Sequence, residues 1–548
     1  MAAEQEQREL LLAAASRFPL PRGTRFSYGT AGFRADGSTM APAVCRAAIV
    51  AALRSLKLAG AATGLVITAS HNPVRDNGVK IADRDGGMMD QRWEPFADAL
   101  ANAPDPDALL RLVLQFARDE GIPLGAGGGG HAAQVLLGRD TRPTGEHLLQ
   151  AALQGINAIV GASKNKGIKA SESDYFAQLI GSFRRLLDLV PKEKTPDDVL
   201  AKKLIVDGAN GIGGVKLQEI KAELSGLHIV VRNSGLEGEG ILNEMCGADF
   251  VQKEKVLPRG FSPEDVGVRC ASLDGDADRL VYFCVSSASN NKVDLVDGDK
   301  ILSLFALFIR EQLDIINKDG DQANKLLPAR LGIVQTAYAN GASTEFLKSL
   351  GLEVVFTPTG VKYLHKKALE YDIGIYFEAN GHGTVLFSED FISQLESLTK
   401  ELSAKAAAVA GSAQYQAAMR LMAASQLINQ AVGDALSGLL LVEAVLQYKG
   451  WSFQNWCELY SDLPSRQLKV KVIDRSAIVT TDAETRVSQP SSLQELIDME
   501  TAKYSHGRCF VRPSGTEDVV RVYAEASTQE AADGLARAVA HHVERLLG

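Results

Sequence analysis

Short apolar runs alternate with helical patterns along most of the chain. Leu65–Ile67 and Val135–Leu137 are typical of strands in a first unit, and Leu204–Asp207 opens a second unit. A third unit begins with the strongly apolar helix predicted over Lys300–Ile316 and continues with strands such as Ile373–Phe377. Strands that alternate with helices indicate a layered α/β fold.

The last part of the chain follows a different pattern. Residues Gln426–Tyr448 predict one long amphipathic helix, and Gly507–Ala526 alternates like a sheet around a central loop. The chain has 548 residues, more than one hydrophobic core supports. We therefore expect an α/β protein with three similar α/β domains built on mixed sheets and a smaller α+β C-terminal domain around a central cleft. The expected domains are residues 1–190, 191–299, 300–440 and 441–548.

Composition and charge exclude several classes of protein. A net charge of -9 argues against a surface for nucleic acids or anionic membranes, which needs excess lysine and arginine. The six cysteines are scattered without a C-x-x-C pair, as in a reducing compartment rather than a disulfide framework or zinc site. The N-terminus lacks a basic leader, and no apolar span reaches membrane length. We expect a cytoplasmic protein that binds neither nucleic acid nor membrane, and a monomer.

A serine loop follows the first predicted strand, at Thr68–Pro73. Ser70 stands beside His71, with Lys80 nearby, and a serine hydroxyl becomes a nucleophile when a neighbour takes its proton or a cation stabilises the product. The same residues are also typical of a strand that ends in an ordinary Asn-Pro turn. The motif by itself leaves both readings open.

An acidic loop follows a later strand, with Asp274, Asp276 and Asp278 at alternate positions. In an extended backbone these carboxylates share one face, where they repel one another unless a divalent cation lies among them. An EF-hand would need glycine where Arg279 stands, so Mg²⁺ in phosphoryl chemistry suits the loop better than a calcium buffer. An acidic surface turn is the alternative.

Two further loops offer binding groups. The carboxylate, amide and imidazole of Glu378–Gly383 suit a polar ligand such as a sugar, although an ordinary hairpin would also have this pattern. The guanidinium groups, hydroxyls and glycine near Arg512 suit a phosphate, with a basic surface loop as the alternative. The candidate substrate-binding residues are Glu378, Ala379, Asn380, Gly381, His382, Arg512, Pro513, Ser514, Gly515, Thr516 and Arg521.

Taken together and in this order, the four loops resemble the α-D-phosphohexomutase superfamily across nearly the whole chain. Tyr28–Arg34 and Gly138–Pro143 add further signatures that are similar to those of the superfamily. The combination of Thr-Ala-Ser-His-Asn-Pro with Glu-Ala-Asn-Gly-His-Gly is similar to the phosphoacetylglucosamine mutases of eukaryotes. The alternative within the superfamily is a phosphoglucomutase or phosphomannomutase.

The resemblance implies a phosphoryl group on Ser70 and Mg²⁺ held by Asp274, Asp276, Asp278 and a phosphoserine oxygen. It implies that N-acetylglucosamine 6-phosphate binds through the candidate residues above. Phosphoryl transfer to O1 would give a sugar 1,6-bisphosphate, and return of the O6 phosphoryl group to the serine would release N-acetylglucosamine 1-phosphate, a precursor of UDP-N-acetylglucosamine.

Charge and proton transfer need further residues, because the transition state of phosphoryl transfer spreads charge over three oxygens. Arg34, His71, Lys80 and Arg279 are the candidates, and His71 or Lys80 is expected to move the proton of the sugar hydroxyl.

One departure from the superfamily pattern concerns the first domain. The helix after Gly138–Pro143 runs directly into the basic stretch Lys164–Lys169, where the superfamily usually has another strand and a Thr/Pro-containing segment. We expect a first sheet that lacks a strand or has an exposed edge, with reduced stability or activity. A catalytically impaired homologue that only binds sugar phosphate is therefore another alternative.

Overall fold

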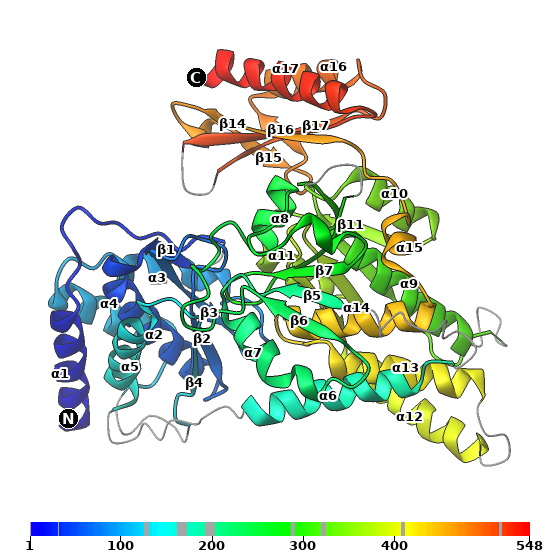
Figure 1. Ribbon diagram of the computed structural model, residues 1–548. Helices are drawn as coiled ribbons and strands as arrows, with labels where there is room; N and C mark the ends of the chain where they lie inside the picture. Colours follow the sequence, from blue (N-terminus) through cyan, green and yellow to red (C-terminus); the bar gives the residue numbers. More distant parts are fainter. Residues whose placement is uncertain are drawn as a thin grey trace.

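The computed structural model describes residues 2–30, 32–124, 131–161, 172–191, 203–286, 291–318, 325–406, 412–514 and 518–548. The N-terminal unit lies on one side of two adjoining middle units, and the C-terminal sheet lies above them with α16 and α17 on its outer face (Figure 1). The expected class of several α/β units with mixed sheets is confirmed.

The N-terminal unit has a mixed four-stranded sheet with the order β1-β3-β2-β4. β2 is parallel to β4 and antiparallel to β3. The strands are β1 (Phe33–Asp36), β2 (Thr63–Ile67), β3 (Asp76–Ala82) and β4 (Val135–Arg139). The helices are α1 (Ala2–Arg17), α2 (Ala41–Lys57), α3 (Glu94–Ala101), α4 (Pro106–Asp119) and α5 (Gly145–Val160).

Packing in this unit centres on α2, which is buried along most of its length. A Cβ on Gly155 of α5 would lie only 2.1 Å from the backbone oxygen of Cys45, so glycine allows the two helices to approach closely. At the other side, β4 forms an edge of the sheet and its Leu136 is 41% exposed. Since residues 162–171 lie outside the described residues, the expected shortening of the first domain stays a prediction.

The two middle units repeat one topology. One sheet has the order β6-β5-β7-β8-β9 and the other β11-β10-β12-β13. In each, a central strand has parallel neighbours on both sides, and an antiparallel strand follows. The strands are β5 (Leu204–Asp207), β6 (Ile229–Arg232), β7 (Arg269–Leu273), β8 (Leu280–Val285), β9 (Val293–Val296), β10 (Leu331–Thr336), β11 (Glu353–Thr357), β12 (Ile373–Phe377) and β13 (Gly383–Phe387).

Helices join these two sheets into one hydrophobic core, to which both sheets and α6, α9, α13 and α14 contribute. The helices are α6 (Glu172–Asp188), α7 (Ile212–Ile220), α8 (Ala248–Glu254), α9 (Gly298–Ile316), α10 (Gly341–Ser349), α11 (Val361–Ala368), α12 (Glu389–Ala406), α13 (Ala413–Leu427), α14 (Ala435–Lys449) and α15 (Phe453–Cys457). The domain limits expected at 299/300 and 440/441 fall inside α9 and α14, and the domain boundaries stay predictions.

The single helix predicted over Gln426–Tyr448 is wrong. The chain leaves the helix after Leu427 because the Asn429 side chain accepts hydrogen bonds from the next backbone N–H groups and forms a turn. Asp434 then caps a new helix, accepting from the N–H groups of residues 436 and 437. This second helix, α14, is buried on nearly every side rather than amphipathic.

The C-terminal unit has a three-stranded antiparallel sheet with the order β14-β18-β17 and a small hairpin. Its elements are β14 (Ser465–Lys471), β15 (Val479–Thr481), β16 (Arg486–Gln489), α16 (Ser491–Thr501), β17 (Arg508–Pro513), β18 (Val519–Glu525) and α17 (Gln529–Leu547). The predicted sheet around a central loop is confirmed by β17 and β18. Among the described residues, no helix is both long and apolar enough to cross a membrane.

Candidate active site

Ser70 lies in the connection between β2 and β3 and is almost fully buried. Its φ of +53° is left-handed, an uncommon conformation for a residue with a Cβ. Thr68 fixes this turn, since its Oγ1 accepts from the Ser70 N–H at 2.8 Å and donates to Asp140 Oδ2 at 2.7 Å. Arg142 Nη2 donates to the backbone oxygens of Ser70 and Asn72. The surroundings therefore hold the hydroxyl in one place.

The acidic loop between β7 and β8 meets this hydroxyl. Ser70 Oγ donates to Asp274 Oδ2 at 2.6 Å, and Asp274 Oδ1 accepts from the backbone N–H groups of Asp278 and Arg279. Carboxylate oxygens of Asp274, Asp276 and Asp278 lie within 4.8 Å of one another. Asp276 Oδ1 is buried without a hydrogen-bond partner. Clustered carboxylates with a free buried oxygen fit a divalent cation.

Lys80, on β3, balances part of this negative charge. Its Nζ donates to Asp276 Oδ2 at 2.9 Å and to Asp278 Oδ2 at 3.0 Å. Burial alone would lower the pKa of Lys80, but the two carboxylates raise it above its usual value, so the side chain stays charged. Burial likewise would raise the pKa of both carboxyls, and Lys80 brings each below its usual value.

Asp274 differs from its two neighbours. Burial, followed by repulsion from Asp278 and Asp276, raises its pKa well above the ordinary range. No lysine contacts it, and Arg279 Nε lies 3.9 Å from its Oδ2. Asp274 is therefore the carboxyl that would gain most from a bound cation.

The other cationic and polar candidates surround the same loops. Arg279 Nη1 forms an ion pair with Asp249 Oδ1 at 3.1 Å. Arg34 Nη1 donates to Asn72 Oδ1 at 3.4 Å, and burial lowers the pKa of Arg34. Burial and the nearby Arg279 lower the pKa of His71 to about 3, so its imidazole is neutral at pH 7 and able to accept a proton.

The sugar loop connects β12 and β13 and lies against the acidic loop. Leu280 N donates to the backbone oxygen of Gly381 at 3.1 Å, and His382 Nδ1 lies 3.3 Å from Asp278 Oδ1. A Cβ on Gly381 would lie 2.1 Å from the Leu280 oxygen, and its φ is +90°, so only glycine fits.

Within the sugar loop, short hydrogen bonds arrange the polar groups. Asn380 Oδ1 accepts from the His382 N–H at 3.0 Å, and Asn380 Nδ2 lies 3.4 Å from Glu378 Oε2. The backbone oxygen of Ala379 accepts from Gly298 N at 3.3 Å, at the start of α9. The hairpin is confirmed, with these polar groups at its tip, and their role in sugar binding stays a prediction.

The hairpin of β17 and β18 carries the predicted phosphate-binding residues. Arg512 and Arg521 are opposite one another across the two strands, and Pro513 follows on β17. Ser514 N donates to the backbone of β18 at 2.8 Å. Gly515–Thr516 lies outside the described residues.

The structure brings most of the predicted residues together. Hydrogen bonds join Ser70 to Asp274 and Lys80 to Asp276 and Asp278, and the sugar loop adjoins this cluster through His382. The functional loops of the first three units each follow a strand and lead into its antiparallel neighbour. These loops therefore lie at the carboxyl ends of strands, where ligands of open α/β sheets bind. The arginines of β17 and β18 form a separate group, described below.

Sequence reasoning missed several supporting residues. Asp140 and Arg142 lie in a stretch noted only as a family signature, yet they hold the serine turn. Asn243 donates to the backbone oxygen of Ser70, Asp249 pairs with a catalytic candidate, and Glu484 pairs with a phosphate-loop arginine. The sequence around these residues has no distinctive pattern, because their roles arise from contacts between distant segments of the chain.

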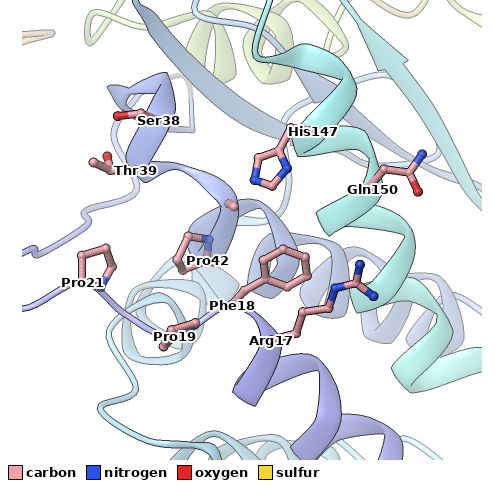
Figure 2. Close-up of a pocket in the computed structure, with 10 residues that line it drawn as sticks. Arg17, Phe18, Pro19, Pro21, Ser38, Thr39, Pro42, His147 and Gln150 are labelled. Atoms are coloured by element: carbon pink, nitrogen blue, oxygen red, sulfur yellow. The ribbon is translucent and has the colours of Figure 1, made fainter.

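A surface hollow of about 370 Å³ lies elsewhere, between the end of α1 and α5 (Figure 2). Arg17, Phe18, Pro42, His147 and Gln150 line it. None of the predicted site residues is among its lining residues, so it is not part of the candidate site.

Comparison with known proteins bears on both fold and site. Models described as phosphoacetylglucosamine mutase AMG1, domains II and III, match residues 166–281 and 297–451. Models of phosphoglucomutase/phosphomannomutase, α/β/α domain I and C-terminal domain, match residues 35–98 and 468–542. A phosphoacetylglucosamine mutase of Oryza sativa subsp. japonica is 74% identical over 544 residues, covering 96% of this chain and 95% of the relative.

Solved structures give the same result. N-acetylglucosamine-phosphate mutase in a substrate complex, described as a member of the α-D-phosphohexomutase superfamily, has a TM-score of 0.86 and 37% identity over 99% of this chain and 100% of its own. Aspergillus fumigatus N-acetylphosphoglucosamine mutase in complex with GlcNAc-6P and magnesium has a TM-score of 0.85 and 37% identity, covering 98% and 99%.

The fold is thus that of a phosphohexomutase, as the resemblance implied. Within that class, the chain belongs to the phosphoacetylglucosamine mutase family.

Proposed function

We propose that the protein interconverts N-acetylglucosamine 6-phosphate and N-acetylglucosamine 1-phosphate, as an intramolecular phosphotransferase of the isomerase class. The observation that carries the proposal is the 2.6 Å hydrogen bond from Ser70 Oγ to Asp274, within the cluster of three aspartates. It places a nucleophile next to groups suited to a divalent cation. Relatives named for this activity, one of them with GlcNAc-6P and magnesium, support the assignment.

The fit of the acidic loop supports Mg²⁺ as the cofactor. Asp274, Asp276 and Asp278 offer one oxygen each, and a phosphoryl oxygen on Ser70 would complete the set. When bound, Mg²⁺ supplies positive charge to the oxygens of the transferred phosphoryl group. Lys80 and Arg279 provide fixed positive charge from the chain itself.

In the first step, the phosphoryl group on Ser70 passes to the sugar. The bond from Ser70 Oγ to phosphorus breaks, a bond from sugar O1 forms, and His71 takes the O1 proton, because its imidazole is neutral whereas Lys80, the other candidate, is charged and has no free electron pair. The sugar 1,6-bisphosphate then turns round. In the second step, Ser70 Oγ attacks the phosphorus on O6, the O6–phosphorus bond breaks, and O6 takes the proton that His71 holds.

Substrate contacts are assigned from the resemblance. Glu378, with Asn380 beside it, takes the sugar hydroxyls, and the loop from Arg512 to Thr516, together with Arg521, takes the phosphate that is not reacting. The product is a precursor of UDP-N-acetylglucosamine, and we place the reaction in the cytoplasm.

The alternatives are weaker. A phosphoglucomutase or phosphomannomutase reading is not favoured, because the relative at 74% identity is a phosphoacetylglucosamine mutase. An impaired homologue is motivated by the open edge at β4, but Ser70, Lys80 and the three aspartates are all present and in contact.

The test is a mutase assay on the full-length chain with Mg²⁺, N-acetylglucosamine 6-phosphate and a trace of the 1,6-bisphosphate. We expect N-acetylglucosamine 1-phosphate, and a fall in kcat of at least about 1,000-fold in Ser70→Ala, since the phosphoryl carrier is lost. Ser38→Ala, an exposed serine of the same unit, is the control and should be fully active. Absence of product, or full activity of Ser70→Ala, would overturn the proposal.

A further inference from the structure

Glu484 occupies a strained turn at the tip of the β15–β16 hairpin. Asp482, Ala483 and Glu484 are three successive residues with φ between +51° and +67°. Each such residue costs free energy unless it is glycine, so the turn persists only where other contacts determine it. The hydrogen bonds of the Glu484 carboxylate indicate which role this turn has.

The Glu484 carboxylate joins two units of the molecule. Arg512 Nε donates to Glu484 Oε1 at 3.0 Å and lies 2.9 Å from Oε2. Thr359, in the loop between β11 and α11, donates to Oε2 from both its backbone N, at 2.8 Å, and its Oγ1, at 2.6 Å. The Arg512 and Glu484 side chains are 14% and 19% exposed, so the pair is largely removed from water.

The Thr359 loop and the first turn of α11 also reach the N-terminal unit. Lys362 Nζ, on α11, donates to Glu94 Oε1 at 2.8 Å, and a Cβ on Gly360, in the loop, would lie 3.5 Å from Thr30. The loop and the start of α11 therefore connect the predicted phosphate-binding hairpin of the C-terminal unit with the unit that carries the serine.

A guanidinium group has two edges, and Glu484 contacts the Nε atom of Arg512. Phosphate is bound most strongly by a bidentate fork, which the two terminal nitrogens can form while Nε is held elsewhere. Holding Nε also removes the rotational freedom that a long arginine side chain would otherwise lose on binding.

We propose that Glu484 is a positioning residue for the proposed mutase reaction: it holds Arg512 ready for the substrate phosphate and ties the phosphate-binding hairpin to the Thr359 loop. The inference rests on the proposed function, in which Arg512 binds that phosphate. The opposite arrangement, in which Glu484 competes with phosphate for Arg512, predicts the opposite sign of effect on affinity.

The experiment measures binding of N-acetylglucosamine 6-phosphate to the full-length chain by calorimetry, together with kcat and KM. We expect Glu484→Ala to raise Kd and KM about tenfold, the cost of roughly one charged hydrogen bond, with kcat within about twofold. Glu484→Gln keeps an acceptor for Thr359 and for Arg512 and should raise Kd only about threefold. Glu495→Gln, an exposed glutamate on α16, is the matched control and should change nothing.

A second variant tests the link to the Thr359 loop. Thr359→Val removes the Oγ1 hydrogen bond and leaves the backbone N–H, so Kd should rise about threefold in the wild-type background. In the Glu484→Ala background it should have no further effect, because the two residues act through one contact. Full additivity would overturn the link; if Glu484→Ala proved too unstable for kinetics, Glu484→Leu, which also lacks an acceptor for Thr359, would take its place.

The outcomes separate this inference from the proposed function. A lower Kd in Glu484→Gln, or unchanged Kd in both Glu484 variants of an active enzyme, would overturn the positioning role alone. A wild type that binds N-acetylglucosamine 6-phosphate but forms no product contradicts the proposed function, while the binding data still decide the role of Glu484. A wild type that binds none of it contradicts both.

Discussion

Two regions of the molecule contain buried carboxyls, but the charges of these carboxyls are balanced differently. One is the serine centre, formed by Ser70, Lys80 and the three aspartates. The other is the seat of the C-terminal unit, formed by Asp297, Asp299, Lys300, Asp462, Arg508 and Glu525. At the serine centre, Lys80 contacts two of the three aspartates, and Asp274 receives two backbone N–H groups. At the seat, Arg508 pairs with Glu525, whereas burial raises the pKa of Asp297 and of Asp299 above the usual range. The centre leaves one carboxyl with a raised pKa, Asp274, where a cation would bind, whereas the seat leaves two, Asp297 and Asp299.

The two regions also differ in how they are tied to the molecule. The serine turn is fixed by hydrogen bonds from three directions, through Thr68, Arg142 and Asn243. The C-terminal unit is held through several contacts: Arg508 donates to the backbone oxygens of Ala337 and Ala339, Glu525 accepts from Gly341 N, and Glu484 accepts from Thr359. Reacting groups need fixed geometry, so a change at the serine turn should act on kcat, whereas a change in the contacts of the C-terminal unit should act on phosphate binding.

The largest expected effect comes from breaking the serine centre with Asp274→Asn. The amide keeps the size of the side chain but removes a negative ligand and the acceptor for Ser70 Oγ. We expect kcat to fall at least about 100-fold with little change in KM, because the lost interaction acts on the transferred group. Steady-state kinetics with varied Mg²⁺ measure this.

A thermal melt adds an independent readout. Mg²⁺ should raise the Tm of the wild type, because a ligand that binds only the folded state stabilises it, and should not raise that of Asp274→Asn. Asp390→Asn, exposed on α12, is the control. Equal stabilisation of wild type and Asp274→Asn by Mg²⁺ would remove Asp274 from the metal site.

Arg508→Ala, which removes the main cation of the seat, should have the opposite kinetic effect to Asp274→Asn, changing KM rather than kcat. Glu525 is fully buried and would be left without its ion pair, so the free energy of unfolding should fall by about 2 kcal/mol, a modest value because Arg508 is 31% exposed. We expect KM to rise about threefold while kcat changes little, since the phosphate anchor moves and the reacting groups do not.

Urea unfolding and kinetics of the same preparation check both parts of this prediction. Arg537→Ala, an exposed arginine on α17 of the same unit, should leave both unchanged. If kcat of Arg508→Ala fell as far as that of Asp274→Asn, the seat would affect the chemical step, and the two regions would not differ in this respect.

The sequence was most informative where chemistry is local. Asp274, Asp276 and Asp278 are adjacent in the chain, so their spacing alone indicates a cation, and the strand before them follows from an apolar run. The break at Asn429 was missed because the apolar pattern continues across it, and only turn chemistry separates α13 from α14. Asp140, Asp249 and Glu484 act on residues far away in the chain, which no local pattern can reveal.

The smallest effect should appear in the pH dependence of stability, through Asp297→Asn at the seat. Burial, then the nearby Asp462, raises the pKa of Asp297 to about 7, against roughly 4 for an unfolded chain. Between these values the folded state binds the proton more tightly, so the wild type should lose stability as pH rises from about 4 to 7.

Asparagine cannot ionise and caps α9 equally well, accepting from Asp299 N as aspartate does. Asp297→Asn should therefore melt higher than the wild type at pH 8, by a few °C, and equally at pH 4. Asp105→Asn, the exposed cap of α4, should leave the pH profile of Tm unchanged. Since Asp299, Lys300, Asp462, Glu525 and Arg508 share the seat, an unaltered profile in Asp297→Asn would assign the unbalanced acid to Asp299 instead.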